Sequence, residues 1–188
     1  MTIHIWKPTR KEILAAKDKS VPDVIGYNLQ VLFCGINPSL YSAAVGHHFA
    51  RPGNRFWPTL YVSGFTDRLY SPFEDHDLVR SGCGITNIVN RATATAAELS
   101  REELVKGGKK LERKVRRYAP KYIAMVGISA YRAAFDQPRA VIGRQENNLG
   151  KAQVWVLPNP SGLNAHYQLN ELEKLFSELY RSAYASAD

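Results

Sequence analysis

The stretch NLQVLFCGINPS, residues 28–39, decides the fold prediction. Its apolar run stops at a proline, which is the pattern of a buried strand that ends in a loop. Three more apolar runs follow along the chain: CGITNIVNR (83–91), YIAMVGIS (122–129) and AQVWVLPNPSG (152–162). Continuous apolar runs of this kind are typical of parallel strands that are covered on both faces.

Helical segments separate these four runs. The aromatic side chains of residues 54–65 fall on one helical face, and Ser100 and Glu103 have capping-box spacing before a segment that Pro120 closes. A short segment, AYRAAF, and a C-terminal one, NELEKLFSELYRSAY, complete the set. The alternation predicts an α/β fold: a single-domain three-layer α/β/α sandwich around a mostly parallel four-stranded sheet. We expect one domain over residues 1–188, with a lead-in at 1–28 and the core at 29–184.

Composition narrows the class of protein. The chain has 188 residues, 45% hydrophobic and 22% charged, and a net charge of +8, which favours a polyanionic partner such as nucleic acid. Two cysteines are too few for a four-thiolate metal site, and their apolar contexts predict buried thiols. No run of about 18 apolar residues exists, and the first residues lack a secretory apolar core. We expect a cytoplasmic protein, nucleoid-associated if the source is bacterial, that does not bind a membrane.

Residues 100–121 hold nine Lys or Arg and three Glu, which is most of the net positive charge. The basic residues fall mostly opposite the stripe of Leu104 and Tyr118, so we interpret them as a solvated helix face rather than a phosphate track.

The loops that follow the four strands predict the functional site. Ligands of open parallel sheets bind beyond the carboxyl ends of the strands. The segments there are 37–39, 86–91, 127–129 and 158–166, which are rich in Asn, Ser, Pro and Gly and contain no carboxylate. Between Asp23 and Asp67, 43 consecutive residues contain no acid at all. Such a rim can bind a neutral heterocycle beside phosphates without repulsion.

Other kinds of site are excluded by their missing motifs. The chain has no GxxxxGK[ST] phosphate loop, no dinucleotide fingerprint, no HExxH and no GxSxG. His47 and His48 are adjacent but have no third ligand near them in the sequence, so no metal is expected.

Three motifs occur in a fixed order along the chain, and together they are more specific for a family than any one alone. They are GINPS (35–39), GHHFARPGNRFW (46–57) and NPSGL (159–163), with ITNIV (85–89) between them. Together they resemble the mismatch-specific uracil-DNA glycosylase and thymine-DNA glycosylase family of the uracil-DNA glycosylase superfamily. The resemblance implies a monofunctional DNA glycosylase that flips uracil, or in some members thymine or a modified pyrimidine, out of a G·U or related mismatch and starts base-excision repair. It also implies no metal or organic cofactor, double-stranded DNA as partner, and a monomer.

The resemblance also implies a role for each motif residue. Asn37 holds the attacking water, and Phe49 stacks on the flipped base. Backbone groups at Ile36 and the side chains of Ser42, His48 and Asn87 contact the pyrimidine. The wedge loop is expected to enter the base stack through Leu163 and to meet the widowed guanine; its residues are Asn159, Pro160, Ser161, Gly162 and Leu163. Arg51, Arg55 and Arg91, near the same rim, are predicted phosphate contacts.

Two positions depart from the family pattern. Ser39 stands where familiar members have glycine, and Ala165 stands where they have arginine. Two alternatives therefore stay open: a uracil-DNA glycosylase of broader specificity that also acts on single strands, and a catalytically silent mismatch-binding module. No lysine in the motifs is placed as a Schiff-base nucleophile, so no lyase step is expected.

Overall fold

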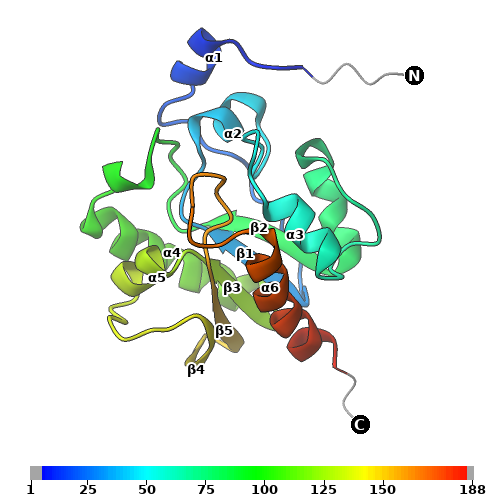
Figure 1. The fold of residues 1–188 in the computed structure, drawn as a ribbon. Coiled ribbons are helices and arrows are strands. Elements are labelled where there is room, and N and C mark those ends of the chain that lie inside the picture. The colour runs from blue at the N-terminus through cyan, green and yellow to red at the C-terminus, as the bar shows by residue number, and fades with distance from the viewer. Residues whose placement is uncertain (1–5, 186–188) are drawn as a thin grey trace.

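A five-stranded sheet forms the centre of the protein (Figure 1). The structure is a computed structural model that describes residues 6–185. The strands are β1 (Val31–Gly35), β2 (Cys83–Asn87), β3 (Tyr122–Val126), β4 (Gly143–Leu149) and β5 (Ala152–Leu157). Their order is β2-β1-β3-β5-β4, and β2, β1, β3 and β5 are parallel. These four are the predicted strands, and the prediction of a mostly parallel α/β sheet is confirmed.

The predicted count of four strands is wrong by one, because β4 was missed. Its sequence, GRQENNL, has only one apolar side chain that could signal a strand. β4 lies at the sheet edge and pairs antiparallel with β5 through an irregular register. Its strand conformation comes from this hairpin pairing, since four of its seven residues are exposed.

Helices cover both faces of the sheet (Figure 1). The α-helices are α1 (Arg10–Leu14), α2 (Leu40–Val45), α3 (Phe56–Val62), α4 (Arg101–Tyr118), α5 (Ile128–Ala134) and α6 (Leu169–Tyr184), with 3-10 helices η1 (Pro72–Ser81) and η2 (Ala96–Glu98). α3 packs with α6 on one face, and α4 packs with α5 on the other. The predicted capping box of Ser100 and Glu103 begins α4. The three-layer prediction is confirmed.

Alternate residues of β1 divide the core into two halves. Phe33 is fully buried among aromatic side chains of the α3 and α6 layer, including an edge contact with Phe56 at 5.5 Å. Leu32 and Cys34 point into the other half, toward Leu111 of α4. Because both faces are buried, the strand is apolar throughout, which is why its sequence was informative.

Part of the segment 1–28, predicted as a lead-in, packs against the rest of the domain as part of its hydrophobic core. Ala16 and Val21 are buried beside Ala43 of α2, and Val24 pairs antiparallel with Ile85 of β2. Within residues 6–185, no helix is both long and apolar enough to cross a bilayer. The two thiols are free and buried, and burial raises the pKa of Cys83 to about 12.

Candidate active site

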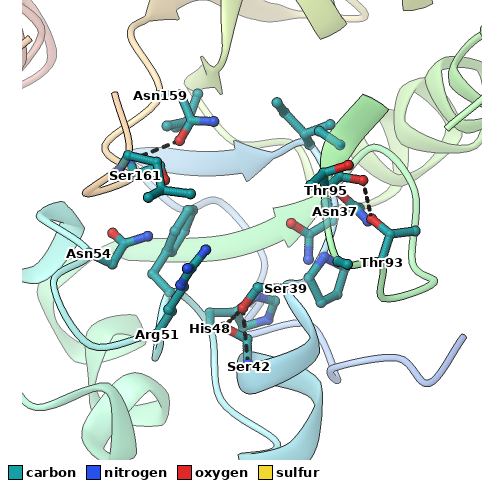
Figure 2. Close-up of a pocket in the computed structure, with 18 residues that line it drawn as sticks. Asn37, Ser39, Ser42, His48, Arg51, Asn54, Thr93, Thr95, Asn159 and Ser161 are labelled. Atoms are coloured by element: carbon teal, nitrogen blue, oxygen red, sulfur yellow. Dashed lines mark hydrogen bonds between the residues drawn. The ribbon is translucent and has the colours of Figure 1, made fainter. Parts of the chain in front are cut away.

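A pocket of about 220 Å³ opens where the parallel strands end (Figure 2). The chain passes from β1 to β2 on one side and then to β3 on the other side of β1, so the loops diverge there and leave a crevice. Ten predicted site residues line this pocket: Ile36, Asn37, Ser42, His48, Phe49, Arg51, Asn87, Asn159, Ser161 and Leu163. Four others do not: Arg55, Arg91, Pro160 and Gly162. Of the predicted rim, residues 127–129 also stay outside.

The Asn37 side chain is held in one orientation by its amide nitrogen. Nδ2 donates to the carbonyl oxygen of Arg91 at 3.0 Å and to Oγ1 of Thr93 at 2.7 Å. The Thr93 hydroxyl donates its own proton to the carbonyl of Thr95 at 2.8 Å, so it can only accept from Asn37. Both amide protons are therefore used, and Oδ1 remains as an acceptor at the pocket. A water that donates to Oδ1 would be positioned but not deprotonated.

Ser39 has a local role that glycine could not fill. It caps α2: its Oγ accepts from the backbone N–H of Ser42 and donates to Oγ of Ser42, both at 3.1 Å. Ser42 Oγ in turn accepts from the N–H of Ala50 at 3.1 Å. These bonds tie the loop after β1 to the segment that carries His48 and Phe49.

His48 is a buried, neutral acceptor rather than a charged group. Its Nε2 lies 2.8 Å from the carbonyl oxygen of Pro22, which cannot donate, so Nε2 carries the proton and Nδ1 has a free lone pair. Burial is the main cause that lowers the pKa of His48 below its usual range. At neutral pH this ring adds no positive charge to the pocket.

Phe49 occupies a strained backbone conformation, with φ at 52°. A bulky residue there costs roughly 1–2 kcal/mol, and such strain clusters at functional sites. One face of its ring stacks on Phe56, with centroids 4.0 Å apart and planes at 20°. The stack holds a half-buried aromatic surface against the pocket.

Asn87, the last residue of β2, brings an unpartnered amide to the pocket. Its side chain is 6% exposed, and no residue in 6–185 hydrogen-bonds to that amide. The space it occupies depends on Gly35, because a Cβ there would meet Asn87 Oδ1 at 2.6 Å and the Phe49 ring at 3.3 Å. Both polar atoms of this amide remain accessible from the pocket, so they are available to bond to a ligand there.

The wedge loop, residues 159–163, forms the opposite wall (Figure 2). Asn159 Oδ1 accepts from the N–H of Ser161 at 3.0 Å and tightens the turn. Leu163, 74% exposed, extends from the loop beside the pocket mouth. Gly162 packs so closely on Gly53 that a Cβ would lie 2.5 Å from the Gly53 carbonyl oxygen.

The structure gives Arg55 and Arg91 other partners than phosphate. Arg55 donates to three carbonyl oxygens within and after the wedge loop, those of Gly162, Asn164 and Tyr167. Arg91 pairs with Glu103 at 2.6 Å and Asp18 at 3.1 Å. The Arg91 guanidinium, with the Ser100 N–H, lowers the pKa of Glu103 to about 2.

The pocket lining includes residues that the sequence did not indicate, among them Thr93 and Asn54, and it includes Arg51, a predicted phosphate contact. Thr93 follows the ITNIV motif in a run of small residues that gave no chemical signal. Arg51 is exposed and, within the described residues, takes part in no ion pair. Among the residues that line this pocket there is no Asp, Glu, Lys or Cys, as the acid-free rim predicted.

The comparisons with known proteins agree with this geometry. The sequence model of the uracil DNA glycosylase superfamily matches residues 22–183. The chain belongs to the uracil DNA glycosylase superfamily. Membership implies a DNA glycosylase, a hydrolase that acts on uracil in DNA.

The fold of the superfamily is also found in a solved structure. The chain is similar to the solution structure of a putative uracil DNA glycosylase from Methanosarcina acetivorans, with 17% identity and a TM-score of 0.52. The match covers 87% of this chain and 98% of that one. This similarity supports the fold and assigns no role to any single residue.

Proposed function

We propose that this protein is a monofunctional glycosylase that removes uracil mispaired with guanine from duplex DNA. Water oxygen bonds to C1′ of the deoxyribose, the C1′–N1 bond breaks, and the base leaves with the electron pair as an anion. The water proton passes to solvent or to the departing base. The product is an abasic site, which starts base-excision repair.

The observation that carries this proposal is the fixed amide of Asn37. Its two protons are bound by Arg91 and Thr93, so Oδ1 can hold a water for attack. A neutral amide cannot accept a proton as a carboxylate does, and no carboxylate lines the pocket. Catalysis then rests on positioning and on stabilising the departing base, which favours bases that leave easily as anions.

The other predicted residues support recognition of a flipped pyrimidine. Asn87 and backbone groups at Ile36 would bond to the base edge, with Ser42 and His48 nearby. Phe49 would stack on the base, a contact worth about 1–3 kcal/mol. No lysine lines the pocket, so no covalent lyase step is expected.

The wedge loop supports action on duplex DNA. Flipping a nucleotide costs a few kcal/mol and costs least at a mismatch. Leu163 is exposed and apolar, as required of a side chain that fills the vacated space, and Asn159 and Gly162 would face the widowed guanine. Of the three predicted phosphate contacts, Arg51 is the best placed to bind DNA, because it lines the pocket and has no carboxylate partner among the described residues.

The test is alkaline cleavage of a labelled duplex with one G·U pair, beside A·U, G·T and single-stranded uracil, for wild type and Asn37→Ala. We expect cleavage at G·U that Asn37→Ala loses while it still binds DNA. Equal cleavage of single strands would favour the broader uracil-DNA glycosylase. Tight G·U binding without any cleavage would favour the silent binding module, and full activity of Asn37→Ala would refute the role of Asn37.

A further inference from the structure

Outside the pocket, two histidines and a buried carboxylate meet on the far side of the loop that carries Phe49. His47 comes from the chain after α2, and Asp75 and His76 come from η1. One ligand atom from each lies within 4.8 Å of the other two. None of the three lines the pocket. His47 thus has the additional ligands that its neighbourhood in the sequence lacks.

Asp75 is the centre of this cluster. It is 1% exposed, and Oδ2 accepts from the backbone N–H of His48 at 3.1 Å. Oδ1 lies 3.0 Å from Nδ1 of His47 and 3.7 Å from Nε2 of His76. Within residues 6–185, no Lys or Arg forms an ion pair with this carboxylate. A buried carboxylate is costly unless a cation compensates it, and the side chains that lie near this one are two imidazoles.

We propose that His47, Asp75 and His76 bind a zinc ion. Two imidazole nitrogens and one carboxylate oxygen are a donor set that Zn²⁺ prefers, with a water in the fourth position. In a tetrahedral site such ligand atoms lie about 3.4 Å apart, close to the two distances found here. The His76 ring is 71% exposed, so it can turn toward the ion and leaves the fourth position open to water.

The surroundings orient two of the ligands before an ion arrives. The His48 N–H fixes the Asp75 carboxylate, and the His47 ring packs edge-on against Phe73 at 5.0 Å. Such supporting contacts raise metal affinity because less ordering remains to be done on binding. The ion would fasten residues 47–49 to η1 and so stabilise the strained Phe49 backbone. Its role is to hold the loop, and it takes no part in the chemistry of the pocket.

The test is calorimetric titration of the EDTA-stripped, dialysed full-length protein with Zn²⁺, together with the visible spectrum on adding Co²⁺. We expect one equivalent bound and Co²⁺ bands of a tetrahedral N/O site. We also expect affinity at least tenfold weaker in His76→Ala and in His47→Gln, and unchanged in His166→Ala, which removes an exposed histidine outside the cluster. The unfolding midpoint of the wild type should rise with Zn²⁺ concentration, and that of His76→Ala should not.

Two results would overturn the zinc site. One is wild-type affinity no higher than that of His76→Ala, and the other is an equal loss in His166→Ala. Because the His76 ring is exposed, its removal leaves the fold intact, and circular dichroism of each variant verifies this.

Discussion

The two walls of the pocket are built in opposite ways. On the Asn37 wall, the Asn37 amide donates both of its protons, to the Arg91 carbonyl and the Thr93 hydroxyl, and that hydroxyl donates to the Thr95 carbonyl. On the wedge wall, Leu163 is largely exposed, and the loop is held from behind by Arg55. One wall is set before DNA arrives, whereas the other presents an apolar tip to solvent.

The difference matches two physical demands. A water must be held within a fraction of an ångström of its line of attack, and small displacements cost large factors in rate. A wedge must place an apolar side chain in the base stack, so its tip has to be free of contacts within the protein. Changes to the first wall should therefore affect the chemical step, and changes to the second should affect DNA affinity.

Among variants that keep Asn37, the largest effect is expected for Gly35→Ala. The added Cβ would meet Asn87 Oδ1 at 2.6 Å and push both Asn87 and Phe49 from their positions. We expect the single-turnover rate on G·U duplex to fall about a hundredfold, since misplacement by an ångström has that order of cost. Gly26→Ala is the matched control, because its Cβ meets Val79 at 3.3 Å, outside the pocket. Equal losses in both variants would refute the argument.

Leu163→Ala should weaken G·U duplex binding about tenfold, because the apolar side chain that fills the vacated space is lost. The cleavage rate at saturating enzyme should stay close to that of the wild type. Stability should not change, because the side chain is 74% exposed. Fluorescence anisotropy with a non-cleavable uracil analogue measures the affinity. Leu69→Ala, another exposed leucine and not part of the pocket lining, should bind normally. A lower cleavage rate at saturating enzyme, with normal DNA affinity, would show that Leu163 acts in the chemical step and not in DNA binding.

Thr93→Val should lower the single-turnover rate about fivefold without changing DNA affinity. Valine keeps the shape but removes one hydrogen bond that orients the Asn37 amide, and a net loss of about 1 kcal/mol corresponds to this factor. Thr66→Val is the control, since its buried hydroxyl has no partner in the described structure. An affinity loss equal to the rate loss would show that Thr93 belongs to DNA binding.

The smallest effect concerns the acid stability of the Asn37 wall. Because the folded pKa of Glu103 is lowered to about 2, its ion pair with Arg91 is complete above pH 4.3 and is lost as the pH falls toward 2. Glu103→Gln should therefore lose less stability than wild type between pH 5 and pH 2.5. Thermal unfolding over this range measures the difference. Parallel curves would show that the pair contributes nothing.

The sequence predicted those parts of the fold that depend on local patterns. Four strands are apolar because both of their faces are buried, and the Ser100 capping box begins α4 as expected. The strand β4 was missed because edge pairing, rather than an apolar pattern, makes GRQENNL extended. The 3-10 helix η1 did have a signal, since Ser71, Pro72 and Glu74 form a capping box with proline at the first position.

The sequence predicted which residues gather at the site, but it did not predict their hydrogen-bond and ion-pair partners within the protein. Motif order brought Asn37, Phe49 and Asn87 to one pocket. The sequence could not show that Arg55 and Arg91 bond within the protein, because their partners lie up to 112 residues away. The roles of the pocket residues on DNA stay predictions.

The contact between Gly162 and Gly53 has a consequence for protein engineering. The carbonyl of Gly53 leaves no room for a side chain at Gly162, so the wedge loop lies in close backbone contact with the segment that carries Arg51. A side chain at position 162 would clash with this backbone carbonyl whatever the side chains of residues 51–54 are. A library aimed at altered opposite-base preference should therefore keep Gly162 and vary the other residues of the wedge loop.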